Sequence, residues 1–347
     1  MVYILLIAAG LWFLGRELNI PTRKRWVLIG LLYLLVLVLL VLLPNGHPVQ
    51  SALGGSLGEW LLIGGCVALF FGYRKGLGLL RQRANMEEAK TEAARPVETF
   101  EGGEVERYAR HIMLREIGGP GQKKLKRAKI LVIGAGGLGS PACLYLAAAG
   151  VGTIGVIDDD VVENTNLQRQ IAHTDARIGM AKVFSAQAAM KAVNPYVTVR
   201  PYQRRLSEEI AKDLFADYDL VLDGTDNFET RYLANAACVA AGLPLVSGAL
   251  TQWEGQISVF DAAHFGPCYR CVFPEAPAAG LAPSCAEAGV LGPLTGVIGS
   301  MMAVEAVKVL TGAGEALAGR MLIYDALYGE VRVIGLNKRD DCATCGK

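Results

Sequence analysis

The chain has 347 residues, enough for one large or two ordinary domains, and its 34 Lys and Arg residues against 33 Asp and Glu residues leave a net charge of +1. This small net charge argues against a nucleic acid or another polyanion as the partner. Hydrophobic residues make up 52% of the chain and the mean hydropathy is +0.33, which is high for a purely soluble protein, and the excess lies in the first 80 residues.

Three apolar runs in these first 80 residues predict a transmembrane segment with spans at about 1–15, 26–43 and 58–73. The second run holds eighteen residues without a charge, and a helix of that length is about 27 Å long, close to the thickness of a bilayer core. The third run is short, so a buried or interfacial helix is the alternative there. For the first run the alternative is a signal peptide, but no basic region precedes it and no clear cleavage site follows it.

The basic residues predict how this segment lies in the membrane. Residues 44–59 contain no Lys or Arg. Basic residues gather in the loop between the first and second runs and again after the third run. By the positive-inside rule, the first loop and the chain beyond residue 80 face the cytoplasm, which requires three crossings of the cytoplasmic (inner) membrane. Residues 81–104 are polar and predict a linker, and residues 105–347 form a soluble domain.

The soluble domain begins with a nucleotide-binding pattern, AKILVIGAGGLGSPACLYLAAAGVGTIGVID at 128–158. It predicts a strand, a glycine turn, a helix and a second strand. Gly134, Gly136 and Gly139 fit G-x-G-x-x-G, and Asp158 ends the second strand, where a carboxylate can accept hydrogen bonds from ribose hydroxyls. The pattern predicts a Rossmann-like site but does not separate NAD from ATP.

Helices and strands continue to alternate after this pattern, which predicts an α/β fold with a mostly parallel sheet and helices on both faces. Ligands bind at the carboxyl ends of such strands, so Asp158 and Asp226 are expected to converge. The predicted helices are 181–193, 207–215, 228–241 and 294–310, and the predicted strands are 197–202, 219–223, 243–247 and 256–260.

The stretch VIDDDVVENTNLQRQ at 156–170 carries polar residues that a dehydrogenase has little use for. Arg169 and Lys182 can bring two positive charges to a triphosphate, and Asp226 can coordinate magnesium between its oxygens. An NAD site binds only a diphosphate and does not require two cations and a metal carboxylate. The alternative is a solvated loop without a ligand. The four histidines fall mostly outside these motifs, and His111 and His173 are interpreted as structural.

Two C-x-x-C pairs, Cys268 with Cys271 and Cys342 with Cys345, supply four soft ligands suited to tetrahedral zinc. Such a site would fasten the C-terminus to the domain; a disulfide or a redox pair is the alternative. Three further cysteines lie in apolar segments and are interpreted as buried, namely Cys66, Cys143 and Cys238. Cys285 precedes the predicted helix 294–310, whose first amides can lower the pKa of its thiol.

From residue 105 onward the chain carries an ordered series of motifs, RYARHIMLREIG, GQKKL, GAGGLGS, DDDVVENTNLQRQ, GMAKV, DGTDNFETR, PLVSGA, EGQISVF, PCYRC, SCAEAGVLGPLTGVIGS and CATC. By these motifs it resembles the adenylyltransferases that activate ubiquitin-like sulfur carriers. The resemblance is to molybdopterin-synthase adenylyltransferase and its sibling in the thiamine pathway, which are similar to the adenylation half of ubiquitin-activating enzymes.

The resemblance implies an ATP and magnesium site. Gly137 and Asp158 contact the adenosine, Asp226 coordinates magnesium with Asn227 beside it, and Arg169 and Lys182 neutralise the phosphates. The loop residues implied to line the phosphates are Thr165, Asn166, Leu167, Gln168 and Arg169, and the nucleotide site as a whole also includes Gly134 and Gly136. The resemblance further implies a homodimer in which Arg110 reaches the phosphates of the partner subunit.

The implied reaction is adenylation of the C-terminal carboxylate of a small sulfur carrier, most simply the small subunit of molybdopterin synthase, with the thiamine carrier as the alternative. That carboxylate has a pKa near 3.5, roughly, so no general base is required. Cys285 either handles sulfur or an acyl group, as in some relatives, or is idle. The remaining alternatives are a membrane-tethered nucleotide-sensing domain, a membrane-anchored NAD-dependent oxidoreductase and a pseudo-enzyme that binds partners without turnover.

Overall fold

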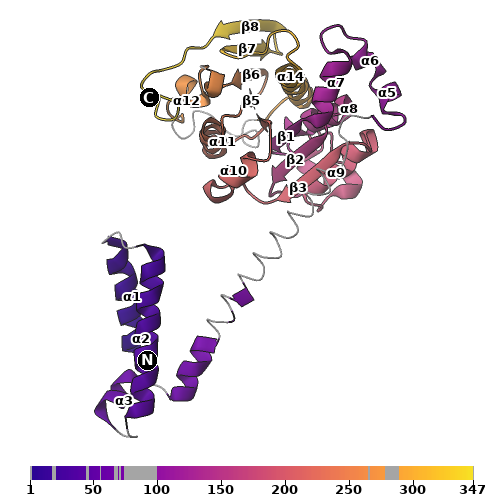
Figure 1. The fold of residues 1–347 in the computed structure, drawn as a ribbon. Coiled ribbons are helices and arrows are strands. Elements are labelled where there is room, and N and C mark those ends of the chain that lie inside the picture. Colours follow the sequence, from indigo (N-terminus) through magenta and orange to yellow (C-terminus); the bar gives the residue numbers. More distant parts are fainter. Residues whose placement is uncertain are drawn as a thin grey trace. The chain divides into compact units, whose positions relative to one another are not determined.

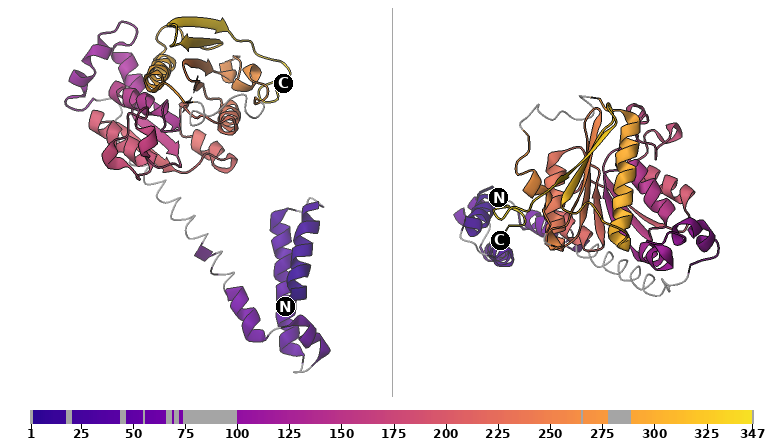
Figure 2. Two further views of the ribbon diagram at one scale, coloured as in Figure 1. Left: turned by 180° about the vertical axis from the view of Figure 1, so that it is seen from behind. Right: turned by 90° about the horizontal axis from the view of Figure 1, so that it is seen from above.

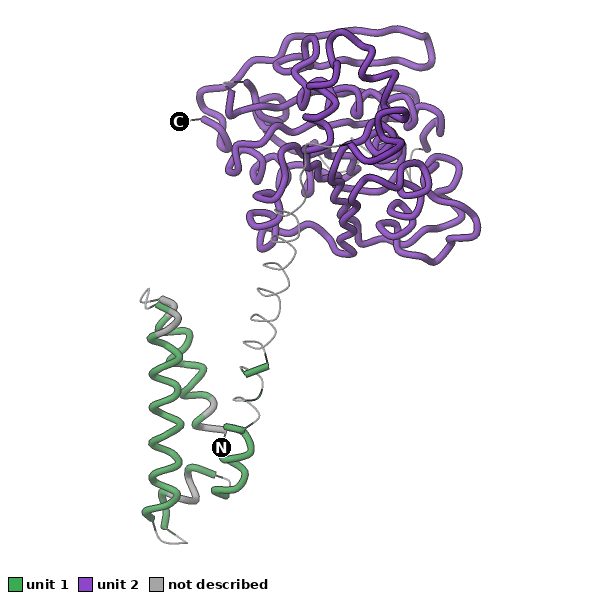
Figure 3. Tube along the Cα trace, turned by 45° about the vertical axis from the view of Figure 1, so that its right-hand side comes forward, with its two compact units in different colours: residues 1–96 green, residues 97–347 purple. Residues whose placement is uncertain are grey.

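The computed structural model describes residues 2–17, 21–43, 47–54, 56–65, 69, 72–73, 100–264, 266–277 and 289–346. The chain divides into two compact units, Met1–Pro96 and Val97–Lys347 (Figure 3). This boundary falls within the predicted linker 81–104, of which only 100–104 belongs to the described residues.

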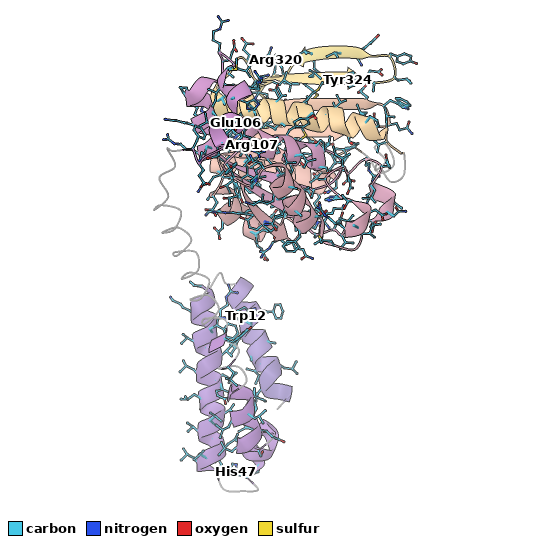
Figure 4. The ribbon with its side chains drawn as sticks, turned by 90° about the vertical axis from the view of Figure 1, so that its right-hand side faces the viewer. Trp12, His47, Glu106, Arg107, Arg320 and Tyr324 are labelled. Atoms are coloured by element: carbon cyan, nitrogen blue, oxygen red, sulfur yellow. The ribbon has the colours of Figure 1, made fainter. Side chains whose placement is uncertain are left out.

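The N-terminal unit is helical, with α1 at Val2–Glu17, α2 at Thr22–Leu42, α3 at Pro48–Leu53 and further helix at 57–65. Helix α1 lies along α2, where Trp12 (Figure 4) meets Trp26 edge to face with ring centroids 5.1 Å apart. Trp60 is buried, its Nε1 donates to the Gly54 carbonyl at 3.0 Å, and Tyr33 donates its hydroxyl to the Trp60 carbonyl at 2.7 Å. These polar atoms are therefore satisfied within the unit.

Three spanning helices, as predicted from the sequence, are not supported. Among the described residues, two helices are long and apolar enough to cross a membrane, Lys24–Leu42 and Gly292–Thr311, and the second is a half-buried helix of the C-terminal unit. Helix α1 has 16 residues and is about 24 Å long, which is less than the roughly 30 Å of a bilayer core. The predicted span 58–73 lies partly outside the described residues.

The C-terminal unit is built on one eight-stranded sheet with the order β3-β2-β1-β4-β5-β6-β7-β8 (Figure 1). The first five strands in this order run parallel, and β6, β7 and β8 add antiparallel pairs. The prediction of an α/β fold with a mostly parallel sheet is confirmed. The strands are Lys129–Ile133, Thr153–Asp158, Thr198–Gln203, Leu220–Asp223, Leu245–Leu250, Glu254–Phe260, Arg320–Asp325 and Glu330–Gly335, from β1 to β8.

Helices cover both faces of the sheet (Figures 1 and 2) because the strands are apolar on both sides. In β1, Ile130 and Val132 belong to one buried cluster, and Leu131 and Ile133 belong to the other. The first cluster includes α7 (Gly118–Arg127), α8 (Gly139–Ala149), α9 (Lys182–Val193) and α14 (Gly292–Thr311), and the second includes α10 (Glu208–Phe215), α11 (Phe228–Ala241) and α12 (Tyr269–Val272). Short 3-10 turns lie at Asn164–Asn166, Asp175–Arg177 and Ala262–His264.

Two short helices before the sheet, α5 (Glu104–Arg107) and α6 (Ala109–Ile112), are anchored to this unit by polar contacts. The Asn194 amide donates to the hydroxyl of buried Tyr108 at 2.7 Å and to the Ala147 carbonyl at 2.7 Å. Arg107 (Figure 4) donates to the Val193 carbonyl at 2.8 Å. Tyr108, which lies between α5 and α6, is therefore fixed to the core through Asn194. It anchors α6, the helix that carries Arg110.

The glycine turn after β1 requires glycine at two positions for different reasons. Gly134 has a φ of +89°, in the region that L side chains rarely adopt. A Cβ on Gly139 would lie 1.9 Å from the Gly134 carbonyl oxygen, so a side chain there would push the start of α8 away from the turn. The tight connection brings the first turn of α8 to the carboxyl end of β1.

Candidate active site

A cleft of about 750 Å³ lies at the carboxyl ends of β1, β2 and β4. The chain leaves β1 toward β2 on one side, and β4 lies on the other, so this is the point where the strand order reverses and where such sheets bind ligands. The cleft is lined by Gly134, Gly136, Gly137, Asp158, Arg169, Lys182, Asp226 and Asn227, together with residues from the ends of β3 and β5. The structure thus brings these eight predicted residues together.

Asp158 is oriented by two backbone amides. The Ala135 amide in the glycine turn donates to Oδ2 at 2.7 Å, and the Asp160 amide donates to Oδ1 at 2.8 Å. Burial raises the pKa of Asp158 above its ordinary value, while the nearby Lys182 charge and these two hydrogen bonds oppose that rise. The carboxylate therefore has a defined direction at the end of β2 and retains further lone pairs for ligand hydroxyls.

His173 contacts the same glycine turn through the Ala135 carbonyl. The ring is buried, with Nε2 2.9 Å from the Ala135 carbonyl oxygen and Nδ1 2.9 Å from Ser185 Oγ. Burial lowers the pKa of His173, and the nearby charges of Lys182 and Arg177 lower it further. A neutral ring has one N–H, which must point at the carbonyl, so Ser185 donates its hydroxyl to Nδ1.

Lys182 is buried and forms an ion pair with the exposed Asp160, with Nζ 2.6 Å from Oδ2. The Lys182 amide also donates to the Asp160 carbonyl at 2.9 Å. The ammonium group therefore has a fixed position at the wall of the cleft before any ligand binds. Because its partner is open to solvent, an incoming anion can compete with Asp160 for the charge.

Arg169 is held by its own loop. Its guanidinium donates to the Thr165 carbonyl at 3.2 Å and to Asn166 Oδ1 at 3.0 Å, and Thr295 on α14 donates its hydroxyl to the Arg169 carbonyl at 3.1 Å. The other residues predicted to line the phosphates are near this turn but do not line the cleft, namely Thr165, Asn166, Leu167 and Gln168. Two of them contact the guanidinium instead.

Asp226 and Asn227 follow β4. The Asp226 side chain is exposed and faces the cleft. Asn227 is the N-cap of α11, because its Oδ1 accepts a hydrogen bond from the Thr230 amide at 2.9 Å. An exposed carboxylate beside the Arg169 and Lys182 cations is the kind of oxygen ligand that magnesium prefers.

Several cleft residues received no role from the sequence. Gln170 is buried, and within the described part of the chain its Oε1 accepts no hydrogen bond. Arg204 and Arg205 reach the cleft from the loop after β3, and Arg231 reaches it from α11. Gln170 and Arg231 lie within the NLQRQ and DGTDNFETR motifs, so the sequence contains a signal for a role of these two residues at the site. No sequence motif indicates that the loop after β3 lies beside Asp158.

Of the two remaining predicted catalytic residues, Arg110 and Cys285, the structure describes only Arg110. Arg110 is exposed on α6, where its guanidinium lies 3.8 Å from Met113 Sδ, and it does not line the cleft. Cys285 lies outside the described residues, as does Cys66.

The four cysteines of the two C-x-x-C pairs come together at α12. Their sulfurs are 3.9 Å apart for Cys268 and Cys271, 3.6 Å for Cys268 and Cys342, and 3.4 Å for Cys271 and Cys345. Four thiolates around a tetrahedral zinc, with Zn–S bonds of about 2.3 Å, are separated by roughly 3.8 Å. The cluster therefore fits a zinc ion in both size and donor type. Cys143 and Cys238 are buried in the two apolar clusters, away from these sulfurs.

The strand order and the cleft together define a Rossmann-like nucleotide-binding protein. The chain belongs to the ThiF family, which it matches over residues 108–344. It is 52% identical over 246 residues to "Probable adenylyltransferase/sulfurtransferase MoeZ" of Mycobacterium tuberculosis, covering 70% of this chain and 63% of that one. It is 49% identical over 247 residues to "Sulfur carrier protein adenylyltransferase" of Thermus thermophilus, covering 70% of this chain and 91% of that one.

These relatives confirm the family resemblance that the motifs indicated, although the chain spans less than two thirds of the length of the Mycobacterium tuberculosis protein. A third relative, "SAMP-activating enzyme E1" of Haloferax volcanii, is 46% identical and covers 72% of this chain and 92% of its own length. Among solved structures, Escherichia coli MccB with MccA-N7isoASN has a TM-score of 0.62 at 22% identity, covering 70% of this chain and 75% of that one, which supports the fold.

We predict that His173 makes the stability of the C-terminal unit sensitive to mild acid. The pKa of a histidine in the unfolded chain is about 6.5 and that of His173 in the folded chain is lower, so the unfolded state binds the extra proton as the pH falls below about 6.5. The free energy of unfolding should then fall by up to about 1.4 kcal/mol per pH unit. Denaturant unfolding at pH 7 and pH 5.5 should show a smaller fall in His173→Asn; an equal fall in both proteins would contradict the assignment.

Proposed function

We propose that this chain is an ATP-dependent adenylyltransferase that activates the C-terminal carboxylate of a small ubiquitin-like sulfur carrier and releases pyrophosphate. The observation that carries the proposal is the cleft itself, where two held cations and an exposed carboxylate meet an oriented Asp158 at the carboxyl ends of the strands. Relatives that are about half identical to this chain are named as adenylyltransferases, and the Thermus thermophilus relative is named for a sulfur carrier.

The residues of the cleft fit ATP. The amides of the glycine turn and of the start of α8 can donate hydrogen bonds to phosphate oxygens, and Asp158 can accept hydrogen bonds from ribose hydroxyls. A magnesium ion held by Asp226, when bound, neutralises charge on the phosphates. Arg169 and Lys182 already lie at the wall of the cleft, Arg169 held by its own loop and Lys182 by Asp160, so little reorganisation is required when the nucleotide binds.

The chemistry requires the approach of two anions. A C-terminal carboxylate is already ionised at neutral pH and can attack the α-phosphate without a general base. The barrier comes from repulsion between that carboxylate and the triphosphate and from charge that develops on the leaving pyrophosphate. Cations at fixed positions lower both costs by orientation and electrostatic stabilisation. This requirement accounts for a cleft whose charged residues are Arg, Lys, Asp and Glu and whose nearby histidine is buried against the glycine turn.

The proposed carrier is the small subunit of molybdopterin synthase, with the thiamine-pathway carrier as the alternative. The sequence resemblance supports this choice, and the relatives' names support the broader class of sulfur carriers. A homodimer in which Arg110 completes the partner's phosphate site belongs to the same proposal. The exposed position of Arg110 on an anchored helix suits that role.

We predict that Asp226→Ala reduces carrier-dependent ATP–pyrophosphate exchange by at least about 100-fold, because the metal would lose its carboxylate ligand. The fold should be unaffected, since Asp226 is exposed and Asn227, which caps α11, is retained. Exchange is measured with radiolabelled pyrophosphate and the purified carrier, with circular dichroism as the check on folding. Exchange at the wild-type rate in this variant would exclude Asp226 as a metal ligand, and exchange without any carrier would exclude the proposed substrate.

We also propose that the four-cysteine cluster holds a structural zinc ion. Cys342 and Cys345 lie after β8, near the end of the chain, and the cluster joins them to Cys268 and Cys271 at α12. The sulfur separations and the all-thiolate donor set support zinc, and the closed set of four ligands suits a structural site rather than a catalytic one. The ion would fasten the last residues to the sheet.

We predict one zinc ion per chain in the purified protein, measured by plasma mass spectrometry after dialysis. Cys342→Ser should lose most of this zinc and lower the midpoint of thermal unfolding, because three thiolates bind zinc far more weakly than four. Cys238→Ala is the matched control, since Cys238 is buried outside the cluster and its loss should leave the zinc content unchanged. Wild-type protein without zinc would refute the proposal.

The N-terminal unit is proposed to hold the chain in the cytoplasmic (inner) membrane with the catalytic unit facing the cytoplasm, an orientation that requires a second crossing between α2 and residue 105 because the basic loop before α2 is also placed inside. Helix α2 supports this because the stretch Lys24–Leu42 is strongly apolar and only 11% of it is buried. Its exposed apolar residues include Trp26, Leu31, Leu34, Val38 and Leu42. A helix that exposes apolar side chains in this way along its length is suited to lipid rather than to water.

We predict that the wild-type chain remains in the membrane fraction after alkaline carbonate extraction. Leu34→Arg places a charge near the middle of α2, at a cost of about 3 kcal/mol on insertion scales, and should shift chain out of that fraction. Leu327→Arg, at a similarly exposed leucine of the C-terminal unit, should not. A wild-type chain found entirely in the soluble fraction would refute membrane insertion, and protection of a C-terminal tag in inverted vesicles would refute the orientation.

A further inference from the structure

At the cleft, Arg231 joins two neighbouring segments of its wall, the loop after β4 and the end of β5. Arg231 lies on α11 and is only 5% exposed. Its Nη2 donates to the Thr225 carbonyl, in the loop after β4, and to the Gly248 carbonyl on β5 at 2.8 Å. Its Nη1 donates to Ser247 Oγ, also on β5, at 3.1 Å. One planar guanidinium thus bridges the β4 loop and the end of β5.

Asp223, the last residue of β4, completes the arrangement from below. Its side chain is fully buried, and Oδ1 accepts hydrogen bonds from both the amide and the hydroxyl of Thr225, at 3.0 and 2.6 Å. Oδ2 accepts no hydrogen bond within the described part of the chain and lies 3.6 Å from Arg231 Nη1. A buried carboxylate of this kind requires a compensating charge, and Arg231 supplies it.

Thr225 is therefore fixed at its amide, its hydroxyl and its carbonyl, and the next residue is Asp226. On the other side, Asn227 is fixed as the N-cap of α11. The backbone of Asp226 lies between two restrained neighbours, while its carboxylate remains exposed to the cleft. The backbone from which this carboxylate extends is consequently placed by contacts that the Asp226 side chain does not make.

We infer that Arg231 is a positioning residue for the metal ligand Asp226. The inference rests on the proposed function, because it gives Arg231 the task of placing Asp226 against the bound ATP and magnesium. The same guanidinium fixes Gly248, which precedes the cleft residues Ala249 and Leu250, so it also sets the spacing between the metal ligand and the β5 wall. Lysine cannot replace this fork of donors, because a single ammonium group cannot reach acceptors on both segments in the same plane.

The test compares ATP binding with and without magnesium, by calorimetry on the full-length chain in detergent. The measured quantity is the ratio of the Kd for ATP in EDTA to the Kd in magnesium. Arg231→Lys should lower this ratio by about 10- to 100-fold, the usual effect of losing a residue that orients a metal ligand. A loss of affinity that is equal in EDTA and in magnesium cancels from this ratio, so the ratio reports the metal-dependent part of binding alone.

A double-mutant cycle separates positioning from general damage to the fold. If Arg231 acts through Asp226, the Arg231→Lys and Asp226→Asn double variant should have the same ratio as Asp226→Asn alone. Arg320→Lys is the matched control, because Arg320 on β7 also pairs with a carboxylate and donates to a carbonyl, at 3.3 and 3.0 Å, and does not line the cleft. Its ratio should equal that of the wild type.

Thr225→Val provides a second variant should Arg231→Lys fail to fold. It removes the hydroxyl that donates to Asp223 while retaining the Arg231 charge, and it should lower the same ratio. The inference is overturned if folded Arg231→Lys, or Thr225→Val in its place, keeps the wild-type ratio, or if the double variant loses more than Asp226→Asn. A wild-type chain that does not bind ATP would instead overturn the proposed function, and the inference with it.

Discussion

The hydrogen bond between the Ala135 amide and Asp158, 2.7 Å long, joins the turn after β1 to the end of β2, and the geometry of the cleft depends on it. The same residue, Ala135, is held through its carbonyl by His173, so the turn is restrained at the peptide units on both sides of Ala135. Gly134 and Gly139 permit that turn because neither the positive φ nor the 1.9 Å approach leaves room for a side chain. A nucleotide would therefore meet an arrangement that is formed before binding.

The two cations of the cleft, Lys182 and Arg169, are also in place before binding. Each has local partners and can still interact with an incoming anion. Lys182 is paired with an aspartate that is exposed to solvent, and Arg169 is bonded to neutral oxygens of its own turn. A buried charge without a partner would cost free energy of folding. A cation in a fully buried ion pair would not readily exchange its partner for a ligand. Arg231 is the opposite case, since its carboxylate partner is fully buried and its donors are directed to backbone and hydroxyl oxygens, which suits a structural link.

Much of the C-terminal unit could be predicted from the sequence because its signals are local. The glycine spacing and the apolar strands are read over a few residues, and the predicted helix 228–241 has the observed bounds. Contacts across the sheet were not predictable in this way. The cleft role of Arg204 and the bridge made by Arg231 depend on which strand ends are neighbours, and the loop at 165–168 turns most of its side chains away from the cleft. In the N-terminal unit, hydrophobicity identified helices but overestimated how many can cross a bilayer.

Helix α14 has a consequence for how such a chain is made. Its hydropathy satisfies the criteria for a membrane helix, yet half of it is buried against α7, α8, β4, β5 and β6. All of these partners precede α14 in the chain, so they have already left the ribosome when it emerges. During synthesis beside a bilayer, a ready-made apolar surface therefore competes with lipid for this segment. Translation order thus offers α14 a protein partner as soon as this helix emerges.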